Sequence, residues 1–200
     1  MAVSLQKGEK IELKNSNGEP MHTLTVGLGW DVFVPPKKWS LFKRQHKAPD
    51  LDCDASALLL QNGKIADNAD IIYFANLVHP SGAVVHIGDN ETGEGDGDDE
   101  QIHIELDKLP AEYDKLIFVV TIYQASLRNQ HLGMLQNAFI RLVDNASDTE
   151  ICRFELNENY QEMKGMIFGE MIREANDWTF NAIGEGIVEE SIDKISLNYR

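Results

Sequence analysis

Apolar and polar residues alternate along several stretches of the chain, and this pattern limits its fold more than any other feature of the sequence. Apolar side chains occupy every second position in the segments 23–30, 101–106, 152–156 and 178–182. A period of two places these side chains on one face of an extended strand. We therefore predict a half-buried β-strand in each segment.

Two continuous apolar runs, 116–122 and 71–74, predict central strands, because a strand that is covered on both faces need not alternate. Segments rich in Asn, Asp, Ser and Gly, which favour turns, separate the predicted strands at 15–18, 61–63, 80–82 and 144–145. Many short strands joined by turns are typical of a β-sandwich.

Helical patterns are fewer. The segment 126–136 is compatible with a short helix, and Val188, Ile192 and Ile195 recur at the spacing of an amphipathic helix near the end of the chain. We expect an all-β fold, a two-sheet β-sandwich with a few short helices including one at the C-terminus. We expect one domain over residues 1–200, with a basic loop inserted at about 34–49 that contains three prolines.

Negative charge is concentrated in two stretches of the chain. The formal net charge is −15; residues 89–100 carry seven acids and no base, and Asp50, Asp52 and Asp54 form a second cluster. Affinity for nucleic acid depends on cations that contact phosphate, so the acidic body argues against that partner.

The segment 37–47 is the local exception, with five basic residues among Trp39, Leu41 and Phe42. It is interpreted either as a solvated insertion or as an element that docks on anionic lipid or another protein.

Crowded carboxylates repel one another, by about 1 kcal/mol for a pair 4 Å apart in water. Apolar segments that read as strands flank both acidic stretches, so the acids cannot spread apart freely and a compensating cation is expected. Oxygen ligands in glycine-containing loops favour Ca²⁺, and less strongly Mg²⁺. The alternative interpretation is a solvated negative face.

Two other metal sites receive less support from the sequence. An EF-hand beginning at Asp50 fails because Ala55 stands where the loop requires Gly and Gln61 where it requires Glu. His86 and His103 flank the longer acidic stretch, but no Cys or His spacing supports zinc.

The cysteines, the length of the apolar runs and the first residues indicate where in the cell the protein is expected. Cys53 and Cys152 could form one bridge or could be two small buried hydrophobic residues. The longest apolar run, 116–122, is far shorter than the roughly 20 residues that span a bilayer, and the first residues do not resemble a secretory signal. We expect a cytoplasmic protein, with a peripheral position at the inner membrane face as an option.

Several motifs occur together in one order along the chain. They lie at 3–8, 27–31, 50–56, 88–100, 118–122, 137–141, 168–170 and 178–186. In this combination the sequence resembles the TerD family of bacterial tellurite-resistance and stress-response proteins, over nearly its whole length. The basic residues and the long segment between Asp31 and Asp50 look more like the TerZ and TerX branches than TerD itself.

The resemblance implies a β-sandwich that binds two neighbouring Ca²⁺ ions and has no established enzymatic activity. Mapped by motif, it implies the metal ligands Asp50, Asp52, Asp89, Asn90, Asp98, Asp99 and Glu100, with Asp31 and Asn76 as further candidates at strand ends. Backbone carbonyls around Gly29 and Gly95 would complete the shells.

The resulting hypothesis is a Ca²⁺-binding stress-response module that is not an enzyme. Its metal-ordered acidic loops would support association with other stress-response proteins, and the basic loop at 37–47 would allow contact with a membrane. The alternative is a dinuclear metal-dependent hydrolase that uses the same carboxylates, although no small-molecule substrate is identified. Glu170 is interpreted as either a buried functional acid or a hydrogen-bonded structural carboxylate.

Overall fold

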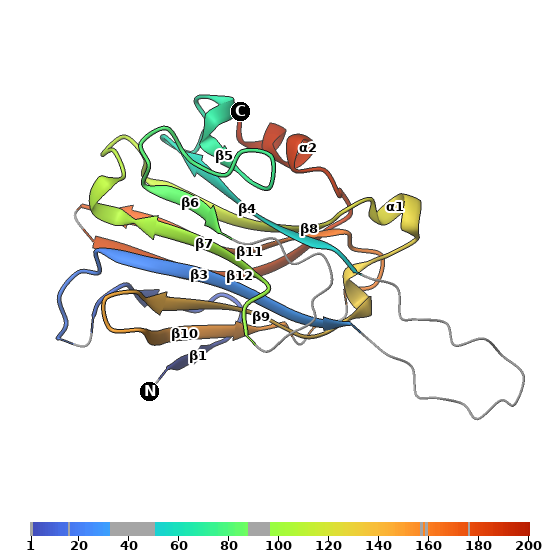
Figure 1. Ribbon diagram of the computed structural model, residues 1–200, viewed down its shortest axis with the longest axis horizontal. Coiled ribbons are helices and arrows are strands. Elements are labelled where there is room, and N and C mark those ends of the chain that lie inside the picture. The colour runs from blue at the N-terminus through green and yellow to red at the C-terminus, as the bar shows by residue number, and fades with distance from the viewer. Residues whose placement is uncertain are drawn as a thin grey trace, which may run out of the picture.

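The computed structural model contains two six-stranded sheets packed face to face (Figure 1). It describes residues 2–15, 17–32, 51–87, 97–156, 158, 160–175 and 177–200. The predicted all-β, two-sheet sandwich with a few short helices is confirmed. The sandwich buries the apolar faces of both sheets against each other.

We call the two sheets A and B. From edge to edge, sheet A contains β1 (Val3–Leu5), β10 (Thr149–Glu155), β9 (Leu135–Asp144), β3 (Thr23–Val32), β7 (Glu100–Glu105) and β6 (Val84–Ile87). Sheet B contains β2 (Lys10–Glu12), β12 (Asp177–Ile187), β11 (Gly165–Glu174), β8 (Lys115–Ile122), β4 (Cys53–Leu60) and β5 (Ile71–Ile72). Only β1 and β10 run parallel among these strand pairs of the described chain.

The helices are short and lie outside the sheets. They are α1 (Ala125–Arg128) and α2 (Ile192–Ser196), with 3₁₀ turns η1 (Asn68–Asp70), η2 (Leu106–Lys108), η3 (Leu132–Met134) and η4 (Leu197–Tyr199). Within the described residues, no helix is both long and apolar enough to cross a membrane.

The predicted strands form as the alternating pattern requires. The apolar side chains of β3 that precede its end, Leu24 to Trp30, are buried in the main core between the sheets. Trp178 and Phe180 of β12 belong to the same core. The continuous run 116–122 lies within β8, whose residues from Leu116 onward are all buried.

The C-terminal helix covers the outer face of sheet B. Ile192 and Ile195 of α2 pack with Leu58 of β4 and Ile117 of β8 in a second apolar cluster. This packing explains why β4 is buried on both faces. The start of this helix differs from the prediction, however, because α2 begins only at Ile192 and Val188 is exposed.

The helix predicted at 126–136 is largely wrong. Helix α1 stops at Arg128, because Asn129 adopts a left-handed conformation with φ of 54°. A 3₁₀ turn follows, and β9 begins at Leu135. The strand predicted at 71–74 is also shorter than expected, since β5 ends at Ile72.

A buried polar network fastens the connection between β5 and β6 to the body of the protein. The Tyr113 hydroxyl donates to Asp70 Oδ1 at 2.7 Å, and His79 Nε2 lies 3.3 Å from the same oxygen. Asp70 Oδ2 accepts hydrogen bonds from the backbone N–H groups of Ala66 and Asp67. Burial, with the hydrogen bond to Asp70, raises the pKa of Tyr113 to about 12.

We expect Tyr113→Phe to lower the free energy of unfolding by about 1–3 kcal/mol, because it removes a donor from the buried Asp70 carboxylate. Urea denaturation measures this loss, and Tyr123→Phe, at an exposed ring, is the matched control. The raised pKa of Tyr113 also predicts how this contribution changes with pH. The contribution of Tyr113 is complete below pH 10 and declines towards pH 12, so the difference between wild type and Tyr113→Phe shrinks there. Equal losses in the two variants would contradict this account.

Candidate functional site

The end of the acidic motif lies directly on β3, where two glycines make room for it. A Cβ atom at Gly27 would come within 2.2 Å of Asp98 Oδ2. A Cβ atom at Gly29 would come within 2.4 Å of the Phe139 ring and 2.7 Å of the Gly97 carbonyl oxygen. The glycines of the motif at 27–31 therefore allow a close approach that no other residue type permits.

Asp98 occupies the outer face of sheet A, above Gly27. Arg141 of β9 donates from Nε to Asp98 Oδ1 at 2.7 Å and from Nη2 to Oδ2 at 3.1 Å. Gln101 Nε2 donates to Oδ2 at 3.2 Å, and the Asp98 side chain is only 1% exposed. A two-pronged Arg–carboxylate pair of this kind is strong and geometrically specific.

Asp99 and Glu100 make different contacts. The Asp99 N–H donates to the Leu28 carbonyl at 2.8 Å, and Asp99 Oδ2 accepts from the Trp30 N–H at 2.9 Å. Glu100 is paired with Leu28 in the β3–β7 register and turns inward. Its Oε2 lies 2.8 Å from His86 Nε2 and accepts from the Ala55 N–H at 3.3 Å, so it connects the two sheets.

His86 and Glu100 are both almost fully buried, with side chains 1% and 2% exposed. Burial lowers the pKa of His86, but the hydrogen bond and the charge of Glu100 outweigh it, and the net shift is upward. His86 thus lies beneath the acidic end of the sandwich, beside the Glu100 carboxylate and 3.1 Å from the Ala55 carbonyl oxygen.

The shorter acidic cluster reaches the same end of the sandwich at the start of β4. The indole Nε1 of Trp30 donates to the Leu51 carbonyl at 3.3 Å, and the Tyr123 N–H donates to the Asp52 carbonyl at 2.8 Å. The Asp52 carboxylate lies 3.5 Å from the Arg128 guanidinium. Trp30 therefore contacts both acidic segments.

The thiol of Cys53 lies among acids of both segments. Burial raises its pKa well above the ordinary value, and the charges of four carboxylates raise it further. These belong to Asp54, Asp52, Glu100 and Asp99. Acids from both segments thus act on one buried sulfur atom, and the expected meeting of the two clusters is seen for these residues.

The remaining predicted ligands are distributed differently. Asp31, at the end of β3, is exposed and accepts a hydrogen bond from Asn137 at 2.7 Å. Asn76 donates its amide to the Ile71 carbonyl at 2.7 Å in the turn that follows β5. Asp50, Asp89 and Asn90 lie outside the described residues, as do Gly95 and the basic loop at 34–49.

Within the described part of the chain, no three His, Cys, Asp or Glu side chains are grouped so that they could hold a metal ion. A metal centre built from Asp52 and Asp99 would need further ligands. The other predicted ligands of the two acidic clusters, Asp50, Asp89 and Asn90, are candidates for that role.

Sequence reasoning missed Arg128 and Arg141 as partners of the acids. Arg141 stands in the motif at 137–141, but its pairing with Asp98 depends on β9 and β7 flanking β3, which no local pattern reveals. Glu170 fits the structural alternative, because it pairs with Lys115 at 2.7 Å and accepts from Asn181 at 3.0 Å.

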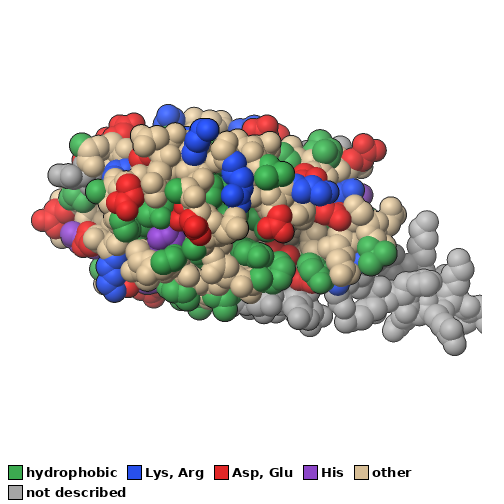
Figure 2. All heavy atoms as spheres, turned by 90° about the horizontal axis from the view of Figure 1, so that it is seen from above, with side chains coloured by type: hydrophobic (Ala, Val, Ile, Leu, Met, Phe, Trp, Pro, Cys, Tyr) green, Lys and Arg blue, Asp and Glu red, His purple; other side chains and the backbone are tan. Residues whose placement is uncertain are grey.

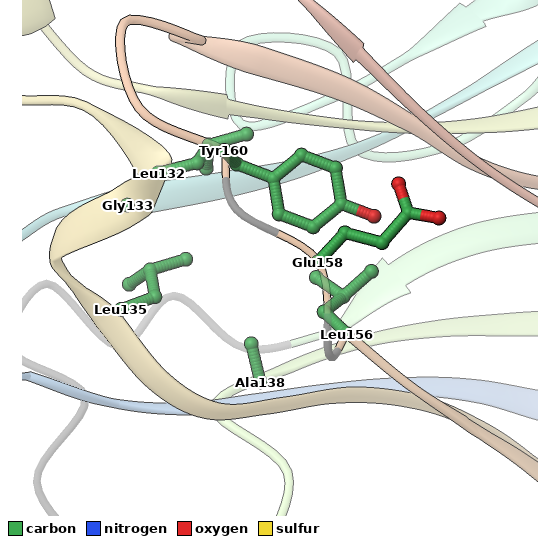
Figure 3. A pocket seen from close by; sticks show the side chains of 7 residues that line it. All are labelled: Leu132, Gly133, Leu135, Ala138, Leu156, Glu158 and Tyr160. Carbon is green, nitrogen blue, oxygen red and sulfur yellow. The ribbon is translucent and has the colours of Figure 1, made fainter.

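A small cavity of about 90 Å³ opens beside η3 and the start of β9. Figure 3 shows Glu158 and Tyr160 side by side along one edge, with Leu135 across from them. The Tyr160 hydroxyl already donates to the Gly184 carbonyl. The lining combines apolar side chains with one exposed carboxylate that pairs with Lys7, which gives no basis for a catalytic role.

The charge of the body is mixed on the face seen from above. Figure 2 shows acidic, basic and hydrophobic side chains interspersed there without a field of one sign. The excess of negative charge is therefore not gathered on this face. This agrees with its concentration in the two acidic segments.

Fold and site together define a class of protein: a two-sheet β-sandwich whose acidic strand ends are gathered around a buried tryptophan. A family model described as the TerD domain matches residues 1–199. The chain belongs to the TerD family.

Named relatives agree with this assignment. The chain is 44% identical to stress response protein SCP2 of Bacillus subtilis over 199 residues, all of both chains. It is 44% identical to tellurium resistance protein TerD of Serratia marcescens over 187 residues, covering 93% and 91% of the two chains. A crystal structure titled as the unknown-function protein SAV2460 superposes with a TM-score of 0.68 at 20% identity, covering 91% and 99%, which supports the fold.

The expected closeness to the TerZ and TerX branches receives no support from these comparisons. Identity is 39% with TerX and 37% with TerZ of Serratia marcescens, below the 44% with TerD of the same organism. The basic segment between Asp31 and Asp50 is therefore not a reliable marker of branch.

We expect both cysteines to resist a thiol reagent such as Ellman's reagent at pH 8 in the native protein and to react after unfolding in guanidinium. Both are free and buried, in different sheets. Burial raises the pKa of Cys152 to about 12 and that of Cys53 well above its ordinary value, so little thiolate forms. Rapid labelling of Cys53 in the folded protein would show that the acidic end opens readily, and rapid labelling of Cys152 would show that β10 does.

Proposed function

We propose that this protein is a stress-response module of the TerD type that binds Ca²⁺ at the acidic end of its sandwich. The observation that carries the proposal is the convergence of two acidic segments, distant in sequence, around Trp30 and Cys53. The name of the relative TerD adds resistance to tellurium compounds as the kind of stress to which such a module responds.

The chemistry of the donor set fits Ca²⁺. The residues available at this end are carboxylates and backbone carbonyls, which are hard oxygen donors in irregular segments. Among the described carboxylates we assign Asp52 and Asp99 to the metal, and Asp50, Asp89 and Asn90 are the further ligands that we propose. Bound Ca²⁺ would supply positive charge where acids otherwise repel each other.

The protein's own groups already prepare this end for a cation. Trp30 holds Leu51 and Asp99 in place through two N–H donors, and Arg128 offsets part of the charge of Asp52. Binding of metal to the folded chain alone would then stabilise it and order the acidic loops. We propose that the ordered loops form the surface on which other stress-response proteins assemble, with the basic loop at 37–47 as a membrane contact.

A binding role is better supported than a redox or hydrolytic one. Direct chemistry on a tellurium oxyanion would require reactive thiols, and Cys53 and Cys152 are both buried with raised pKa values. We also propose that the protein is not a hydrolase.

We expect chelator-treated protein to take up Ca²⁺ in a calorimetric titration, with two ions per chain. At a hundredfold excess over Kd the metal should stabilise the fold by about 2.7 kcal/mol, a rise in Tm of roughly 5–10 °C. Asp52→Asn should weaken binding roughly tenfold, because affinity depends on the charge of the ligands. Asp193→Asn, at an exposed acid in α2, should leave Kd unchanged.

Absence of heat and of any shift in Tm with wild-type protein would overturn the calcium proposal. Calcium- or magnesium-dependent turnover of p-nitrophenyl phosphate, lost in Asp52→Asn but retained in Asp193→Asn, would instead establish the hydrolase.

A further inference from the structure

We propose that Arg141 and Asp98 form a clamp that holds the end of the acidic motif on sheet A, and that Asp98 supports the metal site without binding the metal. This inference rests on the proposed Ca²⁺ site. It separates the acids that bind the metal from Asp98, which holds the segment in position. It makes Arg141, a residue of a strand that carries none of the proposed ligands, a positioning residue for that site.

The first argument is that the Asp98 carboxylate is already fully engaged. Its Oδ1 accepts from Arg141 Nε, and its Oδ2 accepts from Arg141 Nη2 and from Gln101. The side chain is 1% exposed. To bind a metal, this buried carboxylate would have to leave a two-pronged ion pair and abandon a partly buried guanidinium.

The second argument is the place of the clamp in the sheet. Strand β3 lies between β9, which carries Arg141, and β7, which Asp98 precedes (Figure 1). The ion pair therefore spans the outer face of β3, and it does so over Gly27, where any Cβ would collide with the carboxylate. Glu100 lies on the inner side of the same strands, so the two acids face opposite sides of sheet A.

The third argument is what the clamp does to the backbone. Gly97 adopts φ of 120°, and its carbonyl oxygen lies close to Gly29. One residue after Asp98, the Asp99 N–H bonds to Leu28 and the Asp99 carboxylate is held by the Trp30 N–H. A fixed Asp98 thus fixes the position of Asp99, the carboxylate that we assign to the metal. Groups that orient metal ligands in this way typically contribute 10–100-fold to metal affinity.

The test compares Arg141→Gln with Arg153→Gln. Arg153 lies on the neighbouring strand, contacts Glu150 as Arg141 does, and stacks on Phe139. The two variants therefore lose the same charge in the same region. We expect Arg141→Gln to weaken Ca²⁺ binding roughly 10–100-fold in calorimetry with the number of ions unchanged, and Arg153→Gln to stay within about threefold.

Two further variants separate the clamp from general damage to the fold. Arg141→Lys keeps the charge but loses the two-pronged geometry, and an intermediate loss of affinity is expected. Gly27→Ala keeps Arg141 but displaces Asp98, and should reproduce the defect of Arg141→Gln. Asp98→Asn should weaken binding without removing an ion.

A readout without metal completes the test. In chelator-treated protein, amide hydrogen exchange at Asp99 should be at least roughly tenfold faster in Arg141→Gln than in wild type or Arg153→Gln, because its bond to Leu28 loses support.

The outcomes are distinguishable. If wild type binds Ca²⁺ and Arg141→Gln binds it equally well, the clamp is overturned while the proposed function stands. Tighter binding in Arg141→Gln, or loss of an ion in Asp98→Asn, would make Asp98 a ligand and overturn the inference. If wild type binds no Ca²⁺, the proposed function fails together with the supporting role, and the exchange measurement decides whether the clamp orders the segment.

Discussion

The hydrogen bonds of Trp30 are the interaction on which the acidic end of the molecule depends. Its backbone N–H holds the Asp99 carboxylate, and its indole N–H holds the Leu51 carbonyl. One buried residue of β3 thereby ties together two segments that are more than forty positions apart in sequence. Because the indole is packed in the core between the sheets, these donors have fixed positions. The groups of the two acidic segments that they bind are therefore held in fixed positions as well.

At this end of the sandwich, acidic side chains have basic partners at three different depths. Glu100 is paired with His86 between the sheets, Asp98 with Arg141 outside sheet A, and Asp52 approaches Arg128 at the tip. Each pairing lowers the repulsion that the sequence alone would predict for the acids. A buried carboxylate without such a partner would be strongly unfavourable, whereas the acids nearer the surface can be compensated by an ion from solution. Under the calcium proposal, an external cation would therefore be needed for only part of the acidic motif.

Much of the fold could be predicted from local patterns, but the exceptions have identifiable causes. Alternation revealed β3 and β12 because one face of each meets the core. Strand β11 escaped notice because its register shifts between Ile167 and Gly169, which disrupts the period of two. The first two residues of β9 fall within the helix predicted at 126–136, because regular alternation of buried side chains begins only at Ala138.

The candidate site was predictable in composition but not in geometry. Sequence reasoning brought the two acidic clusters together, and the common effect of their carboxylates on Cys53 agrees with that expectation. It treated Asp98, Asp99 and Glu100 as equivalent, whereas strand pairing sends Asp98 outward and Glu100 inward. Which side an acid faces depends on Leu28 being opposite Glu100, a long-range property that no window of sequence contains.

The glycines and the arginine are as much a part of the acidic motif as its carboxylates. A chain with the same acids but a side chain at position 27 would have no room for Asp98 on sheet A, and a chain without Arg141 would leave that carboxylate dehydrated and uncompensated. In either case the segment would lose its support on the sheet, and the position of Asp99 beside Trp30 would be less firmly fixed. A set of acids therefore becomes a candidate metal site only when the surface beneath it has room for the carboxylates and a group that compensates their charge. Here β3 provides the room and its neighbour β9 provides the charge.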